Sequence, residues 1–126
     1  MNYKKLRIAL KANALFSTIS GLWIIFQYQQ IAERMQISNA TILLIIGIIL
    51  LPFAFFVYKT ATAEQISPKK VKFIISQDWL WVVGSVLIIA LQAFGINKIG
   101  FIIIGVVAII VADFAFFQQR YLKAKA

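Results

Sequence analysis

Long apolar stretches separated by short polar ones dominate the pattern of this 126-residue chain. Four stretches carry no charged side chain, and they cover residues 12–32, 41–58, 79–97 and 99–112. A helix needs about 20 mostly apolar residues to cross a bilayer, and the fourth stretch reaches that length if Asp113 lies inside it. The pattern therefore predicts transmembrane helices over about residues 8–28, 40–58, 73–94 and 99–117.

A β-barrel is the other structure that a membrane-spanning chain could form, because backbone groups in hydrocarbon must be hydrogen-bonded within the protein. Barrel strands alternate lipid-facing and polar lumen-facing positions. Residues 42–51 and 101–112 contain no polar side chain with which to alternate. We therefore expect an all-α, polytopic membrane protein, with residues 1–126 forming a single four-transmembrane-helix bundle.

The charges support this interpretation and add an orientation. The chain is 62% hydrophobic and only 13% charged, whereas a soluble domain has about a quarter of its residues charged. All of its 13 Lys and Arg residues except Arg34 and Lys98 fall at the two termini or between the second and third helices. The positive-inside rule then predicts an inner-membrane protein with both termini in the cytoplasm. Because topology explains most of the net charge of +9, we expect no nucleic-acid partner.

The connections between helices are short and of different character. Residues 29–39 form the first external connection, in which Ser38 or Asn39 can cap the following helix. The pattern of residues 31–37 is compatible with a short helical turn at the interface. Residues 95–98 leave so little chain between the last two helices that these must be antiparallel neighbours.

The two halves of the chain resemble each other, which indicates a possible duplicated helical hairpin. Asn13 and Ser20 in the first half match Asp78 and Ser85 in the second at a constant spacing, and the sequence FAFF occurs near the end of each half. Two spans in each unit would give both units the same orientation in the membrane, with a pseudo-twofold axis along its normal.

Polar residues inside the predicted spans are the candidate functional residues. Asn13, Asp78 and Asp113 lie at similar depths near the cytoplasmic ends of three helices, at about 6–8 Å by the helical rise of 1.5 Å per residue. Ser17 shares a helix face with Asn13. We therefore predict a cytoplasm-facing polar layer of Asn13, Ser17, Asp78 and Asp113 that could bind a cation, a proton or an amine.

Two structural interpretations of the same residues stay open. Asp78 could cap the third helix, where a carboxylate favours the positive end of the helix dipole, while Asp113 pairs with an interfacial Lys or Arg. Alternatively, the polar side chains could simply hydrogen-bond between helices. Trp79 and Trp81, which flank Asp78, are typical of an aromatic belt at the membrane interface.

The sequence offers little for catalysis. It contains no Cys and no His, which removes disulfides, common metal sites and the commonest general base. It also has no glycine-rich phosphate loop and no recognisable pairing of a nucleophile with a base. We therefore expect no enzyme activity, no cofactor and no bound metal.

Three functions remain as hypotheses. The first is a binding or assembly module that acts on lipid or on other membrane proteins, as a homo-oligomer or with a different partner. The second is a small oligomeric transporter or channel that uses the layer of Asp78 and Asp113. The third is an accessory protein that handles lipids or isoprenoids in a lateral apolar groove.

Overall fold

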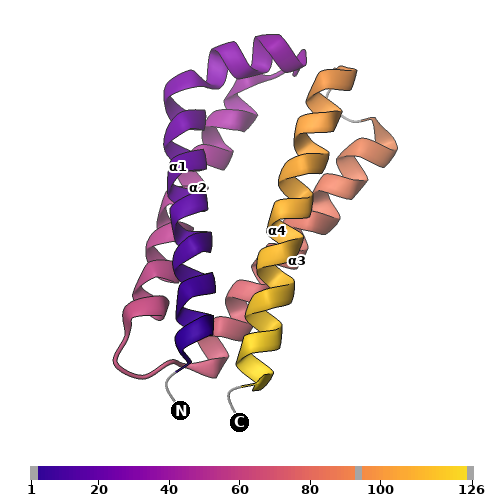
Figure 1. Ribbon diagram of the computed structural model, residues 1–126. Coiled ribbons are helices and arrows are strands. Elements are labelled where there is room, and N and C mark those ends of the chain that lie inside the picture. The colour runs from indigo at the N-terminus through magenta and orange to yellow at the C-terminus, as the bar shows by residue number, and fades with distance from the viewer. Residues whose placement is uncertain (1–2, 93–94, 125–126) are drawn as a thin grey trace.

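The computed structural model describes residues 3–92 and 95–124, and all of its regular structure in that part of the chain is helical. The four helices are α1 (Lys4–Met35), α2 (Ala40–Thr62), α3 (Pro68–Leu91) and α4 (Lys98–Ala124) (Figure 1). Each is long and apolar enough to cross a membrane. The prediction of an all-α, multi-pass membrane protein with four transmembrane helices is thus confirmed.

The helix ends differ from those expected from hydropathy. α1 and α4 extend beyond residues 8–28 and 99–117, and α2 continues past residue 58 to Thr62. α3 begins at Pro68 rather than near residue 73, because Ser67 caps its first turn and proline is favoured in the first helical position. The predicted end of this helix at residue 94 lies outside the described residues. A capping residue sets the start of α3, whereas hydropathy marks only the part of each helix inside hydrocarbon.

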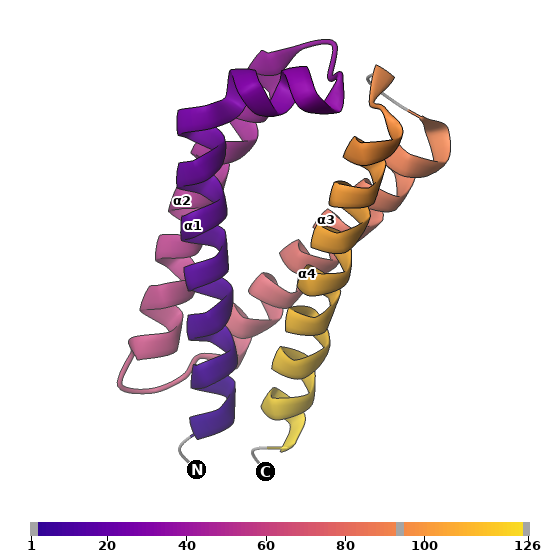
Figure 2. The same cartoon turned by 45° about the horizontal axis from the view of Figure 1, so that its top comes forward.

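The helices form two hairpins, α1–α2 and α3–α4, which run in the same direction (Figures 1 and 2). The described parts of the two chain termini lie at the same end of the molecule, which we call the terminal end. There the hairpins share an apolar core drawn from all four helices and from the α2–α3 connection. Its buried members are Leu6, Leu10, Ala14, Val57, Ala61, Ile66, Val71, Ile74, Ile75 and Ala115.

Two glycines allow α1 and α2 to approach closely. The carbonyl oxygen of Gly47 lies 3.2 Å from the position that a Cβ on Gly21 would take, and Gly21 O lies 3.1 Å from the equivalent position on Gly47. Small residues at such crossings let helix backbones approach in a membrane. Gly21 and Gly47 therefore mark the close crossing of α1 and α2.

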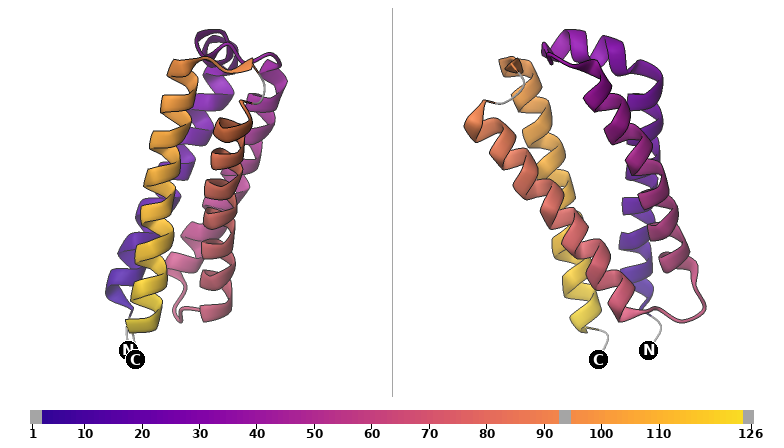
Figure 3. Two further views of the ribbon diagram at one scale, coloured as in Figure 1. Left: turned by 90° about the vertical axis from the view of Figure 1, so that its right-hand side faces the viewer. Right: turned by 180° about the vertical axis from the view of Figure 1, so that it is seen from behind.

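The hairpins diverge from the terminal end and meet again at the opposite end, which we call the distal end (Figure 3). α1 leaves helical geometry at Gln27 (φ −126°, ψ 17°), and its last turns run sideways toward the start of α4. Asn97 N donates to Met35 O at 2.9 Å, and Asn97 Nδ2 donates to Arg34 O at 2.9 Å. These two bonds, the distal contact, connect the last turn of α1 to the α3–α4 connection.

Between the two ends, α2 and α3 have little direct contact. Near the terminal end the rings of Phe56 and Phe73 pack edge to face, with 5.6 Å between their centroids. Farther along, α3 leans away from α2 (Figure 3). One long face of α3 is therefore left without a neighbouring helix.

Candidate functional site

Three buried polar side chains from three helices meet just above the terminal core. Asn13 of α1 is 2% exposed, Asp78 of α3 is 4% exposed and Gln118 of α4 is 0% exposed. Asn13 Nδ2 donates to Asp78 Oδ2 and to Gln118 Oε1, both at 2.9 Å, and Gln118 Nε2 donates to Asp78 Oδ2 at 2.9 Å. We call these residues the polar triad.

Ser17 extends the polar triad by one residue. It lies one turn after Asn13 on the same face of α1, and its Oγ donates to Asn13 Oδ1 at 3.2 Å. Asn13 therefore uses both its amide nitrogen and its carbonyl oxygen. The structure thus brings together three of the four predicted site residues, namely Asn13, Ser17 and Asp78.

Asp113 does not join them, and the expectation that it points into the same layer is wrong. Its side chain is exposed, and no ion pair or hydrogen bond connects it to another side chain within residues 3–92 and 95–124. The buried face of α4 contains Ala108, Val111, Ala115 and Gln118. Asp113 lies five residues before Gln118, which places it about 140° around the helix. Its depth is similar, but its direction is different.

Gln118 takes the inward position, and the sequence analysis missed it. It lies just beyond residue 117, where the fourth transmembrane helix was expected to end. The spacing of Ala108, Val111, Ala115 and Gln118 follows one helix face. Following the face of Ala108, Val111 and Ala115 past residue 117 would have identified Gln118 as an inward polar side chain.

The possibility that Asp78 caps α3 is also excluded. The N-cap of α3 is Ser67, whose Oγ accepts from Lys70 N at 3.4 Å. Asp78 lies in the third turn, well inside the helix. Interhelical hydrogen bonding, the other structural alternative, is what the side chains display.

The positions of Asn13 and Asp78 fit the proposed duplication of a helical hairpin. They occupy equivalent places in α1 and α3, and both are buried. Each follows buried apolar residues at matching spacing, with Leu6 and Leu10 in α1 corresponding to Val71 and Ile75 in α3. The direct hydrogen bond between Asn13 and Asp78 joins the two halves at equivalent positions.

The chemistry open to the polar triad is narrow. Asp78 Oδ2 accepts two amide N–H groups, while Asp78 Oδ1 accepts none from the described residues. No group of three or more His, Cys, Asp or Glu side chains that could hold a metal ion occurs in the described part of the chain. The triad joins α1, α3 and α4, and it leaves one carboxylate oxygen for an additional donor.

A second feature lies on the unpaired face of α3. Trp81 Nε1 is buried and has no hydrogen-bond partner. Gly84, three residues later on a neighbouring part of the face, has no atom from beyond its own turn within 4 Å of the position of a Cβ. The middle of this membrane-spanning helix thus contains a donor that is buried and unsatisfied, Trp81 Nε1, and a glycine that is open to the outside, Gly84.

Comparison with known proteins adds no assignment: no family model, no curated protein and no solved structure matches this chain.

Proposed function

We propose that this protein is a membrane-embedded assembly module, which docks a further transmembrane helix on α3. The observation that carries this proposal is Gly84, whose Cβ position has no atom from beyond its own turn within 4 Å. A second helix crossing at Gly84 could bring its backbone close to that of α3.

The partner that the chain itself supplies is a second copy. Small residues in membrane helices permit the close backbone approach that supports helix association. Two copies of α3 crossing at Gly84 would form a symmetric interface, in which the two Gly84 residues face each other. The proposed setting is a bacterial inner membrane with the terminal end in the cytoplasm, supported by the basic residues that gather at that end.

Cysteine crosslinking tests this proposal cleanly, because the chain has no native cysteine. Gly84→Cys should give a disulfide-linked dimer in native membranes under mild oxidation. Val86→Cys is the matched control, since Val86 lies at a similar depth, is 55% exposed and points about 160° away around α3. Equal crosslinking of both variants, or of neither, would refute the homo-oligomer.

A transporter or channel is the second candidate, and it now depends on Asp78 alone. This carboxylate is buried in a membrane helix without a cationic partner in the described part of the chain, and ionisable residues in that situation often mark ion pathways. Asp78→Asn should then abolish the flux of a cation, a proton or an amine into proteoliposomes, while Asp113→Asn leaves that flux unchanged. A chain with no flux before substitution, or equal flux after both substitutions, would eliminate this candidate.

A further inference from the structure

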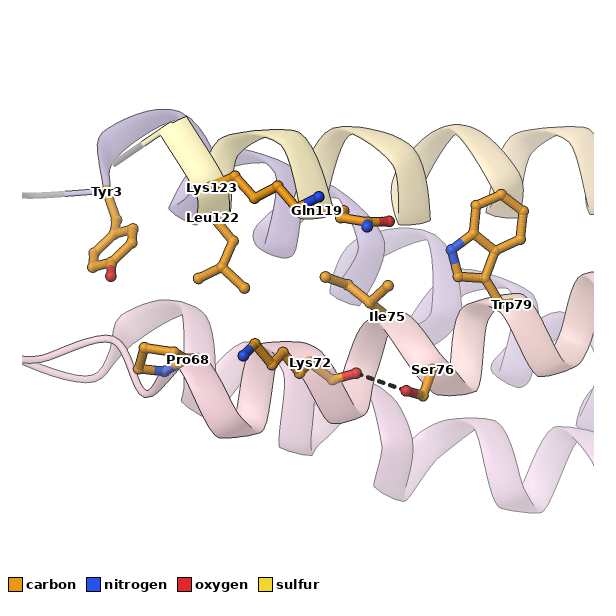
Figure 4. A pocket seen from close by; sticks show the side chains of 9 residues that line it. All are labelled: Tyr3, Pro68, Lys72, Ile75, Ser76, Trp79, Gln119, Leu122 and Lys123. Atoms are coloured by element: carbon orange, nitrogen blue, oxygen red, sulfur yellow. Dashed lines mark hydrogen bonds between the residues drawn. The ribbon is translucent and has the colours of Figure 1, made fainter. Parts of the chain in front are cut away.

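A pocket of about 700 Å³ lies at the terminal end, on the side of the molecule away from the open face of α3. It is formed by the first half of α3, the last turns of α4 and Tyr3 at the start of α1 (Figure 4). Its volume is within the range of about 300–1,000 Å³ that is typical of ligand sites. The proposed dimer contact does not use it, since Trp79 in the pocket and Gly84 point about 140° apart around α3.

The walls of the pocket are apolar and aromatic. Ile75 of α3 and Leu122 of α4 extend into the space between the two helices, and Trp79 closes one end (Figure 4). Trp79 is 39% exposed, so part of its ring is available to a bound molecule. Tryptophan is enriched where a membrane protein meets the head-group region. The walls therefore suit an acyl chain or a glycerol backbone at the edge of the bilayer.

The rim of the pocket is cationic. Lys72 lines the pocket from α3, and Lys123 and Gln119 line it from α4. The Lys72 side chain runs along α3 toward Pro68, and the Lys123 side chain runs along α4 toward Gln119 (Figure 4). No Asp or Glu is present among the residues that line the pocket. Ser76 is already engaged, since its Oγ donates to Lys72 O at 3.0 Å. The two lysines therefore line the pocket with no acidic lining residue to neutralise them.

We propose that this pocket is a binding site for one anionic phospholipid. Its phosphate would lie between Lys72 and Lys123, and its upper acyl chain would follow Ile75, Leu122 and Trp79. A soluble anion would use the two lysines but leave the apolar wall uncovered, whereas a phospholipid satisfies both parts. Basic pockets between transmembrane helices are known to hold lipid head groups.

Native mass spectrometry of the full-length protein in detergent can test this, with phosphatidylglycerol and phosphatidylcholine supplied in equal amounts. The unmodified chain should retain phosphatidylglycerol preferentially. The double variant Lys72→Gln/Lys123→Gln should lower the ratio of bound phosphatidylglycerol to phosphatidylcholine about thirtyfold, from the known contribution of two surface cations.

The matched control is Lys69→Gln/Lys70→Gln, which removes the same charge from exposed positions on the first turns of α3 that do not line the pocket. It should change the ratio less than about threefold, because charge near the site acts only through screened solvent. Lys72→Arg/Lys123→Arg should keep the preference, which excludes misfolding as the cause of a loss.

Three results would overturn the proposal: an equal loss in both glutamine pairs, no preference in the unmodified chain, or displacement of the lipid by soluble glycerol phosphate as effectively as by phosphatidylglycerol. The first would indicate general surface charge, and the last a soluble anion as the ligand. Crosslinking at Gly84 is measured separately, so failure of the lipid site leaves the proposed assembly function testable on its own.

Discussion

Replacing Asn13 with alanine should destabilise the protein more than any other single truncation in the polar triad. Asn13 makes three hydrogen bonds, to Asp78, Gln118 and Ser17, and it is 2% exposed. Its loss would remove two of the three hydrogen bonds inside the triad and leave Gln118 Oε1 without its donor. The remaining bond, from Gln118 to Asp78, connects only α3 and α4.

The magnitude follows from these bonds. Hydrogen bonds between membrane helices contribute on average about 0.6 kcal/mol each, and up to about 1.7 kcal/mol. A buried acceptor left unsatisfied adds about 1–3 kcal/mol. We therefore expect Asn13→Ala to lower the free energy of unfolding by about 2–4 kcal/mol. Ser17→Ala removes one bond of 3.2 Å and leaves one acceptor, Asn13 Oδ1, without its donor, so it should cost about 1 kcal/mol less than Asn13→Ala.

The assay is reversible unfolding in mixed micelles of a mild detergent and SDS, followed by tryptophan fluorescence and circular dichroism. A double-mutant cycle of Asn13→Ala with Gln118→Ala isolates the energy of their interaction, which should be about 0.6–1.7 kcal/mol. The reasoning is refuted if Asn13→Ala costs no more than Ser17→Ala, or if the effects of Asn13→Ala and Gln118→Ala simply add.

Three further predictions concern other parts of the fold. Gly47→Leu should destabilise the α1–α2 hairpin by about 3 kcal/mol or more, because the carbonyl oxygen of Gly21 lies 3.1 Å from its Cβ position. Gly84→Leu should leave the stability of the monomer unchanged in the same unfolding assay, because no atom from beyond its own turn lies within 4 Å of its Cβ position. The Arg7 guanidinium donates to three backbone carbonyls at the end of α2, at 2.6–3.0 Å, and so caps this helix end. Arg7→Gln should therefore accelerate amide hydrogen exchange of residues 60–65. Unchanged exchange would contradict the capping role of Arg7. An impermeant thiol reagent should label Ser38→Cys but not Gln65→Cys in intact cells, and the reverse pattern would invert the proposed topology.

The four helices could be predicted because membrane burial leaves a strong and local signal. Any stretch of about 20 apolar residues reports its own surroundings, whatever it packs against. Depth could be inferred in the same way, which is why Asn13 and Asp78 were expected to lie at one level, and they share a hydrogen bond.

The direction in which a side chain points from its helix, and the residues at which the helices end, leave weaker signals in the sequence. Asp113 and Gln118 are both polar residues near the end of α4, and only the face shared by Ala108, Val111 and Ala115 distinguishes the outward residue from the inward one. In a membrane the outward face is also apolar, so hydrophobic periodicity alone does not reveal which face packs against protein. The divergence of the hairpins depends on distant contacts, such as that of Asn97 with Met35, which leave no periodic pattern.

The departure of α1 from helical geometry at Gln27 has a mechanical consequence. A straight helix of 32 residues would be about 48 Å long, well beyond a hydrocarbon layer of about 30 Å. Because α1 changes direction at Gln27, its last turns, residues 28–35, run across to Asn97. This distal segment of α1 closes the two hairpins into a triangular frame. A rocking motion of one hairpin against the other would have to break the bonds of Asn97 to α1 at the distal end or the hydrogen bond between Asn13 and Asp78 near the terminal end. Such a frame suits a rigid platform better than a moving gate.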